Sequence, residues 1–294
     1  MFEKVESCPV CESKLSDNLI ICKDHTVSKE SFAISRCRNC GFLYTNPRPS
    51  EQRLGSYYES EDYISHNKKS NSLINRIYKI ARKFTVRSKV AMINKFTANK
   101  NTLLDIGCGT GEFINEAKKN KWLINAVEPG TLARKSAEEL NGISIYENIQ
   151  LIEKKKFDAI TMFHVLEHVA DLNGTMKKVR KLLHKEGSLF IALPNSASWD
   201  SIHYKNDWAA FDVPRHLYHF NQETAALLFK KHKLEVVQTL PMKLDAFYVS
   251  LLSEKHAKGK MNYWQAFWNG LKSNKWAKNN QNNYSSLIYV LKKR

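Results

Sequence analysis

The sequence predicts an α/β fold with a mainly parallel sheet, preceded by a small metal-binding module. From residue 102 onward, short apolar stretches alternate with longer polar ones, a pattern typical of strands joined by helices. The first apolar stretch leads directly into a glycine-rich turn. Two cysteine pairs lie within the first 49 residues, ahead of the alternating region.

Seven stretches of the alternating region are predicted strands, and at least four helices connect them. The strands are expected at 102–106, 122–127, 143–146, 157–163, 187–193, 234–240 and 286–291. Helices are expected from about Glu112 and from about Thr131, and over 172–183 and 222–232. Such an order favours a sheet covered by helices on both faces.

An insertion at about 245–284 separates the last two predicted strands. Within it, Trp264, Phe267, Trp268 and Leu271 fall at helical spacing. We expect this face to pack onto the domain or onto a helix at 70–96. A dimer contact or a peripheral membrane contact is the alternative.

The turn after the first strand reads Asp105-Ile106-Gly107-Cys108-Gly109-Thr110-Gly111. Glycine permits positive φ and lets a ligand approach backbone N–H groups. The spacing differs from the dinucleotide fingerprint, and the lysine of a phosphate-binding P-loop is missing. Glu128 ends the second strand, where its carboxylate can accept hydrogen bonds from both hydroxyls of a ribose.

These segments resemble motifs of the class I S-adenosylmethionine-dependent methyltransferases. Residues 104–111 are similar to the first motif of that family and residues 126–129 to the second. Residues 157–160 and 164–169 resemble the fourth-strand motif of the branch that includes ubiquinone-biosynthesis-like O-methyltransferases. The resemblance implies a Rossmann-like seven-stranded sheet in which the last strand, 286–291, is antiparallel.

The resemblance also implies a set of ligand-binding residues for S-adenosylmethionine. Asp105, Gly107 and Gly109 would line the methionine moiety, and Glu128 would bind the ribose. Asn148 would lie near the adenine and Phe163 near the reacting methyl group. The same loop contains Cys108, expected only as a small residue that fits there, and Gly111.

Three histidines are candidate catalytic residues, because an oxygen or carbon acceptor needs a base. His164 follows the fourth strand, at helical spacing from Glu167 and His168. In related quinone O-methyltransferases a Glu-x-x-Glu-His arrangement here is associated with a divalent metal, but this chain has His164 in place of the first Glu.

The other two candidates, His216 and His219, lie in an irregular segment that is expected on the substrate side of the sheet. Arg215 beside them is a candidate anchor for an acidic group. The alternative is a loop whose aromatic residues cap the core.

The first 49 residues carry a strong zinc signal: Cys8-x-x-Cys11 and Cys37-x-x-Cys40. Two such knuckles complete a tetrahedral site of four thiolates, which leaves no open position for catalysis. Cys22 and His25 lie between the knuckles and are competing ligands in principle, although Cys22 is expected as an apolar strand residue. The module resembles zinc ribbons found ahead of some sugar and rRNA methyltransferase domains.

Three regions are therefore expected. Residues 1–49 form a zinc ribbon, 50–98 a tyrosine-rich segment and basic amphipathic helix acting as linker or lid, and 99–294 the methyltransferase domain. The apolar stripe of the helix is expected to contain Leu73, Ile77, Ile80, Phe84 and Ala91. No apolar run approaches the ~20 residues that cross a bilayer, and we expect a cytoplasmic protein without a secretory signal.

The net charge of +17 is concentrated in two segments outside the predicted cofactor site. Residues 66–100 contain ten Lys and Arg and no acid, and residues 241–294 contain ten against two acids. We expect solvated helix faces, or else attraction to an acidic partner: RNA, anionic lipid or a phosphorylated substrate.

The function predicted from these features is methyl transfer to an oxygen or carbon of a small molecule, with an acidic molecule as one option. The alternative is an RNA methyltransferase that uses the zinc ribbon and basic helix to bind RNA. A third hypothesis is a zinc-ribbon adaptor that binds the cofactor only structurally. The oligomeric state and the identity of the acceptor stay open.

Overall fold

A six-stranded sheet lies at the centre of the computed structural model, which describes residues 2–58, 73–99 and 101–294. Its strand order is β11-β12-β9-β8-β6-β7. The strands are β6 (Thr102–Ile106), β7 (Leu123–Val127), β8 (Phe157–Phe163), β9 (Leu183–Pro194), β11 (Leu234–Pro241) and β12 (Ser286–Lys293). β12 is antiparallel to both its neighbours, while β7, β6, β8 and β9 pair in parallel. The predicted mainly parallel sheet with a reversed last strand is confirmed.

The predicted strand at 143–146 is reduced to a single parallel bridge between Val127 and Tyr146. Two hydrogen bonds hold it: Tyr146 N donates to Ala126 O, and Glu128 N donates to Tyr146 O. The chain turns away directly afterwards, where Asn148 caps a 3-10 helix at Ile149–Leu151. The expected seventh strand is therefore too short to extend the sheet beyond six full strands.

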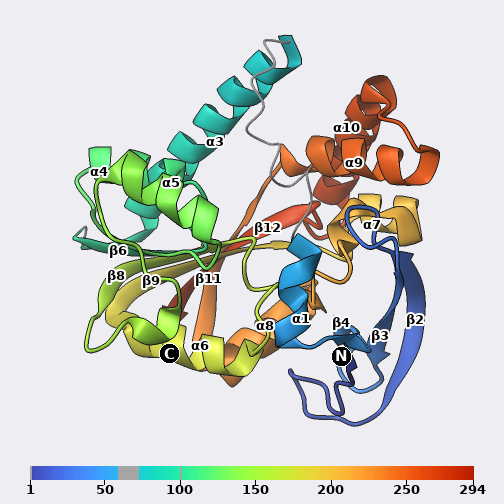
Figure 1. Cartoon of the computed structure of the whole chain (residues 1–294), viewed down its shortest axis with the longest axis horizontal. Helices are drawn as coiled ribbons and strands as arrows, with labels where there is room; N and C mark the ends of the chain where they lie inside the picture. The colour runs from blue at the N-terminus through green and yellow to red at the C-terminus, as the bar shows by residue number, and fades with distance from the viewer. Residues whose placement is uncertain (1, 59–72, 100) are drawn as a thin grey trace.

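Helices cover both faces of the sheet (Figure 1), as the alternating pattern predicts. One face is covered by α3 (Leu73–Phe96), α4 (Glu112–Lys119) and α5 (Thr131–Asn141), and the other by α6 (Leu172–Leu182) and α8 (Gln222–Lys231). α7 (Trp199–Tyr204) follows β9. Strands such as β8 are largely apolar and do not alternate with polar residues, because both faces of the sheet are buried.

Among the α3 residues whose side chains are described, those in the C-terminal part of the helix pack on the body of the protein. Val90 and Ile93 are buried there against α4, whereas Phe84 is 68% exposed and Ala91 faces solvent. The expected stripe through Phe84 and Ala91 is therefore wrong. The rest of the helix projects away from the sheet (Figure 1), so its periodicity did not indicate the packed face. Leu73, Ile77 and Ile80 lie outside the residues whose side chains are described.

The insertion forms two helices, α9 (Asp245–Lys258) and α10 (Tyr263–Asn279). α10 packs on α9 and α7 through the face opposite its aromatic residues. This packed face consists of Ala266, Asn269, Gly270, Ser273 and Ala277. The aromatic face expected to pack inward is exposed, and that expectation is wrong. None of the described helices has both the length and the apolarity that a bilayer crossing requires.

The cysteine-rich segment shares a sheet with the α/β domain. β2 (Ser16–Lys23), β3 (Ser31–Cys37) and β4 (Leu43–Thr45) form an antiparallel sheet, and β10 (Tyr218–His219) adds to its edge. β1 (Phe2–Glu3) pairs with β5 (Arg48–Pro49), and α1 (Glu51–Leu54) with a 3-10 helix at Gly55–Tyr58 follows. The N-terminal segment thereby contacts the predicted histidine-rich loop directly.

Candidate functional site

The glycine-rich loop has the backbone that the sequence demands. Gly107, Gly109 and Gly111 all have positive φ, at 75°, 55° and 87°. A Cβ on Gly107 would lie 2.4 Å from Val165 Cγ2, and one on Gly111 would lie 2.9 Å from Ala137 Cβ. Around Gly109, by contrast, a Cβ would meet nothing within 4 Å. Gly107 and Gly111 therefore allow close packing, and Gly109 leaves the outer side of the loop accessible to a ligand.

Glu128 joins this loop to the end of β7. Its Oε2 accepts a hydrogen bond from Gly109 N at 2.8 Å, and its Oε1 accepts one from Gly130 N at 2.9 Å. Each carboxylate oxygen has a further lone pair to offer, and the side chain is only partly buried. A carboxylate fixed in this way could accept hydrogen bonds from a pair of ribose hydroxyls, and that role of Glu128 stays a prediction.

Asp105 lies beneath the loop and is 3% exposed. It accepts a hydrogen bond from Thr161 Oγ1 at 2.6 Å. Burial raises its pKa to about 7, against the opposing effects of that hydrogen bond and of Lys89. A carboxyl group with this pKa would ionise readily beside a cationic ligand.

Phe163 ends β8 and carries a cation on its ring. The Lys89 ammonium lies 4.1 Å from the ring centroid, and Phe113 contacts the same ring edge-on at 5.3 Å. Burial lowers the pKa of Lys89, while Asp245 and Asp105 oppose that shift. The predicted methyl-facing residue therefore lies beneath a side chain of α3, which sequence reasoning did not single out.

The remaining predicted cofactor residues have local roles in the fold. Asn148 follows the bridging residue Tyr146 by two positions, and its Oδ1 accepts a hydrogen bond from Gln150 N at 2.9 Å. Cys108 is buried in the loop, where burial raises the pKa of its thiol. The loop, the accessible side of Gly109 and the carboxylates of Asp105 and Glu128 together fit a cationic nucleoside such as S-adenosylmethionine.

The predicted histidines surround one buried carboxylate. Glu167 is 0% exposed, and neither of its oxygens has a hydrogen-bond partner among the described residues. His164 Nδ1 lies 3.4 Å from Glu167 Oε1. His168 and His216 offer ring nitrogens within 4.8 Å of the same carboxylate and of each other. These three donor residues, Glu167, His168 and His216, could hold a divalent cation.

His164 is held between two carboxylates. Its Nε2 lies 3.2 Å from Asp245 Oδ2, on the first residue of α9, and its Nδ1 faces Glu167. Burial alone would lower the pKa of His164, but the two acids raise it to about 9. An imidazolium with both nitrogens so engaged is poorly suited to remove a proton at neutral pH, so this geometry favours an electrostatic role over that of a base.

His216 and His219 have one ring nitrogen fixed and one left over. His216 Nδ1 donates to Ala210 O at 2.8 Å, which leaves Nε2 as the acceptor in the neutral ring. Thr45 Oγ1 donates to His216 O, so His219 Nε2 donates to Thr45 Oγ1 at 3.1 Å. Nδ1 of His219 is then a buried acceptor without a partner among the described atoms. Burial and the neighbouring His216 lower the pKa of His219 to about 3.

Arg215 does not serve as an anchor for a ligand. Its guanidinium lies 3.0 Å from Asp24 Oδ1 and 2.6 Å from Asp212 Oδ1, and it also donates to Tyr57 O. Only 4% of the Arg215 side chain is exposed. The expected ligand role is wrong, because the buried Asp24 of the N-terminal segment and the partly exposed Asp212 of its own loop already neutralise the charge.

The four predicted zinc ligands come together. The sulfur atoms of Cys8, Cys11, Cys37 and Cys40 all lie within 4.8 Å of one another. Two pairs, Cys8 with Cys40 and Cys11 with Cys37, are separated by 3.6 and 3.5 Å. Four sulfurs at about 2.3 Å from a tetrahedral zinc would be spaced in this way, so the donor set fits the ion.

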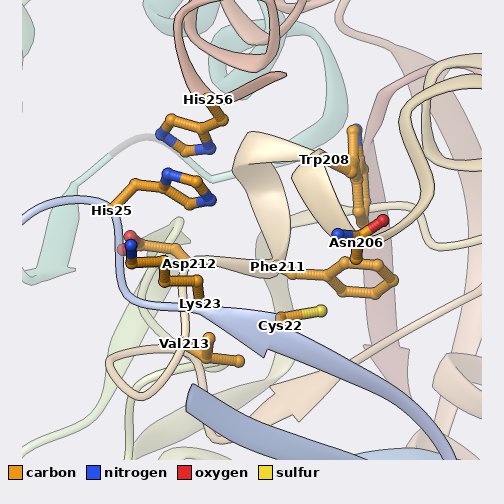
Figure 2. Close-up of a pocket in the computed structure, with 9 residues that line it drawn as sticks. All are labelled: Cys22, Lys23, His25, Asn206, Trp208, Phe211, Asp212, Val213 and His256. Carbon is orange, nitrogen blue, oxygen red and sulfur yellow. The ribbon is translucent and has the colours of Figure 1, made fainter. Parts of the chain in front are cut away.

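Cys22 and His25 lie elsewhere, in a small pocket between the N-terminal segment and α9 (Figure 2). Cys22 is buried in an apolar cluster with Trp208 and Phe211, as expected for a strand residue. The rings of His25 and His256 stack at a centroid distance of 4.1 Å. Neither Cys22 nor His25 belongs to the four-sulfur group.

The comparisons with known proteins agree with this fold. The crystal structure of magnesium protoporphyrin IX methyltransferase from Synechocystis PCC 6803 with bound SAH superposes with a TM-score of 0.55, covering 83% of this chain and 100% of that one. At 10% sequence identity this likeness concerns the fold alone. The sheet order and reversed strand are thus those of a Rossmann-like methyltransferase fold.

Residues 75–239 match the family model described as a methyltransferase domain, and the chain belongs to this family. A ubiquinone biosynthesis O-methyltransferase from Actinobacillus pleuropneumoniae serotype 5b (strain L20) is 33% identical over 107 residues, or 32% of this chain. One from Pelagibacter ubique (strain HTCC1062) is 33% identical over 106 residues, again 32% of this chain. The chain spans 45% and 42% of the length of these two relatives.

Proposed function

We propose that this protein binds S-adenosylmethionine at the glycine-rich loop and methylates an oxygen or carbon of a small molecule. The observation that carries the proposal is the proximity of two sets of groups at the carboxyl ends of the parallel strands. Glu128 and the glycine loop follow β7 and β6, and His164 and His168 follow β8, where Val165 packs against Gly107. His216 comes from the segment between β9 and β10 and joins this group at Glu167. Ligands of open α/β sheets bind at this edge.

Bound S-adenosylmethionine would supply an electrophilic methyl group. The protein has to hold the acceptor about 3–3.5 Å from that group and in line with it. In the proposal His216 removes the acceptor's proton through Nε2, since its Nδ1 is fixed by Ala210 O. His219 remains a second candidate, with Nδ1 available as an acceptor.

Lys89 places a positive charge on the ring of Phe163, whereas the charge of His164 is offset by Asp245 and Glu167. Lys89 supports an acceptor that carries an acidic group. The relatives named as ubiquinone biosynthesis O-methyltransferases support an oxygen acceptor. They are matched over less than half their length, so the acceptor's identity is part of the proposal.

We also propose that Cys8, Cys11, Cys37 and Cys40 bind one structural zinc ion, and that residues 1–49 form a zinc ribbon ahead of a linker at 50–98 and a methyltransferase domain at 99–294. The spacing of the sulfur atoms supports the zinc site. A cytoplasmic location stays a prediction.

The test is transfer of a labelled methyl group from S-adenosylmethionine into a cell extract, with and without nuclease. We expect label in small molecules, unaffected by nuclease. Label confined to a nuclease-sensitive polymer would instead establish the RNA alternative, in which the basic face of α3 contacts phosphates. Cofactor binding without any transfer would favour the adaptor hypothesis.

A further inference from the structure

Helix α10 buries its small and polar residues and exposes its large apolar residues, the reverse of an ordinary surface helix. Its inward face carries only small or polar residues: Ala266, Asn269, Gly270, Ser273 and Ala277. Its outward face carries Trp264, Phe267, Trp268 and Leu271, which are 71, 48, 44 and 39% exposed. A surface helix normally buries its apolar stripe. Large apolar side chains gathered on the exposed face therefore indicate a contact that the isolated chain does not make.

Polar contacts fix the helix in this orientation. Asn269 Nδ2 donates to Tyr204 OH at 2.7 Å, and Ser273 Oγ donates to Asp200 Oδ1 at 2.8 Å. Gly270 lies so close to α9 that a Cβ there would be 2.6 Å from Phe247 Cδ1. Rotating α10 to bury its aromatic residues would break both of these hydrogen bonds. The aromatic face is thus held towards solvent.

The exposed aromatic rings form one continuous patch. The ring centroids of Trp264 and Trp268 are 5.7 Å apart, and those of Phe267 and Trp268 are 5.8 Å apart. Met261 and Tyr263, 41 and 51% exposed, extend the patch towards the loop between the helices. In Figure 1 the two helices lie at the periphery, away from the central sheet, where a flat surface could reach them.

The charged residues around this patch are all lysines. Lys255, Lys258, Lys260, Lys272, Lys275 and Lys278 are exposed, and the sequence contains no Asp or Glu after Glu254. Lys272 and Lys275 follow Trp268 by four and seven residues and so share its side of the helix. The two acids of α9 are turned inward: Glu254 is 2% exposed and accepts a hydrogen bond from Lys258 Nζ at 2.7 Å, and Asp245 faces His164.

We propose that this face, Trp264, Phe267, Trp268 and Leu271 with the six surrounding lysines, docks on the surface of an anionic lipid bilayer. Aromatic rings are favoured at the headgroup level, where one side is apolar and the other wet. Lysines beside them attract anionic headgroups, and the combination is typical of helices that lie in the membrane interface. A second copy of the chain is a poorer occupant, because it would bring six more lysines against these six.

Docking through α10 would bring the candidate active site towards the lipid. α9 precedes α10 and begins at Asp245, whose carboxylate lies 3.2 Å from His164 Nε2. The docking itself does not depend on the proposed methyl transfer and is measured without cofactor or acceptor.

The test is co-sedimentation of the full chain with vesicles of phosphatidylcholine alone and with added phosphatidylglycerol. We expect binding only to the anionic vesicles, weakened by salt. The Trp264→Ser/Trp268→Ser variant should bind about tenfold or more weakly, since it removes the rings that enter the interface. Lys272→Gln/Lys275→Gln/Lys278→Gln should bind about a hundredfold more weakly, because each lysine near an anionic surface contributes about fivefold.

The matched control is Leu132→Ser/Lys135→Gln on α5, which removes an exposed apolar and an exposed basic residue elsewhere and should bind like the unmodified chain. Thermal melting of every variant checks that the fold is kept. The proposal is overturned if the unmodified chain does not bind anionic vesicles, or if both α10 variants bind as well as the control. Self-association that disappears in Trp264→Ser/Trp268→Ser, without vesicle binding, would identify a second copy as the occupant and also overturn it.

Discussion

Arg215 Nη2 lies 3.0 Å from Asp24 Oδ1, in a buried ion pair between the histidine-rich loop and the N-terminal segment. The exposed fractions of the two side chains are 4% and 0%. Asp24 also accepts from three backbone N–H groups, those of Thr26, Val27 and Ser28. The loop that carries His216 and His219 is therefore anchored to a turn that lies almost 200 residues earlier in the chain.

Replacing Arg215 with Met should destabilise the fold strongly. The change leaves the buried Asp24 without its ion-pair partner, which typically costs about 3–5 kcal/mol. Chemical denaturation measures the loss. Arg87→Met is the control, because Arg87 pairs with Glu116 at the surface and such pairs contribute about 0–1 kcal/mol. Equal effects of the two variants would contradict the structural role of Arg215.

Local sequence patterns predicted the parts of the site that depend on neighbouring residues. The glycine loop follows from one strand, one turn and one helix, and the four cysteines from two short knuckles. The pairing of Tyr44 with Tyr218 was not predictable, because residues so far apart in sequence leave no local signal. For the same reason neither Lys89 nor Asp245 was recognised beside Phe163 and His164.

The aromatic face of α10 illustrates a different limit. Helical spacing correctly placed Trp264 and Trp268 on one face, but the spacing is the same whether that face turns inward or outward. The inward face is decided by Asn269 and Ser273, whose partners Tyr204 and Asp200 lie on α7. Polar residues at helical spacing opposite an aromatic stripe were the available signal.

Glu128→Ala should lower affinity for S-adenosylmethionine by about tenfold or more, because lost hydrogen bonds to the ribose cost about 1–3 kcal/mol. Glu128→Gln should lose less, since its amide oxygen can still accept from Gly109 N. Calorimetric titration gives both affinities. Glu139→Ala, an exposed acid on α5, is the control. Unchanged affinity in Glu128→Ala would mean that the ribose is held elsewhere.

Affinity for the cofactor should rise with pH through about 7. Burial raises the pKa of Asp105 to about 7, so much of the carboxyl is neutral below that pH and binds a cationic ligand less well. Binding should therefore release a proton from Asp105, most at or below pH 7. Calorimetry in buffers of different ionisation enthalpy measures that proton. Asp105→Asn should bind more weakly and remove this proton release; if the release is unchanged, another group is responsible.

The raised pKa of Asp105 also affects the stability of the fold, which should decrease with rising pH while cofactor affinity increases. In the unfolded chain Asp105 has its ordinary pKa near 4, below its folded value. The unfolded state thus loses its proton first, and this carboxyl lowers the free energy of unfolding as pH rises from about 4 to about 7. Chemical denaturation at several pH values across this range gives the free energy of unfolding. That free energy should fall less steeply with rising pH for Asp105→Asn than for the unmodified chain.

Removal of zinc should disrupt the histidine-rich loop as well as the N-terminal segment. We expect one zinc per chain by metal analysis, lost in Cys37→Ser and kept in Cys22→Ala, because Cys22 lies outside the sulfur group. Since β10 pairs with β4, unfolding of residues 1–49 would free Tyr218 and His219. Chelation should then abolish methyl transfer while leaving cofactor affinity largely unchanged. Full transfer activity after chelation would show that the histidine-rich loop keeps its structure without the zinc-bound N-terminal segment, which would contradict this prediction.

His216→Gln should lower kcat for methyl transfer by about a hundredfold or more, the usual range for loss of a general base. The amide can keep the hydrogen bond to Ala210 O but cannot accept a proton at neutral pH, so cofactor affinity should stay unchanged. His203→Gln, an exposed histidine on α7, is the control. A larger loss in His219→Gln than in His216→Gln would move the base to His219, whose Nδ1 is a buried acceptor without a partner among the described atoms. If kcat falls in neither variant, neither histidine is the general base. The acceptor would then be nucleophilic enough to react without one.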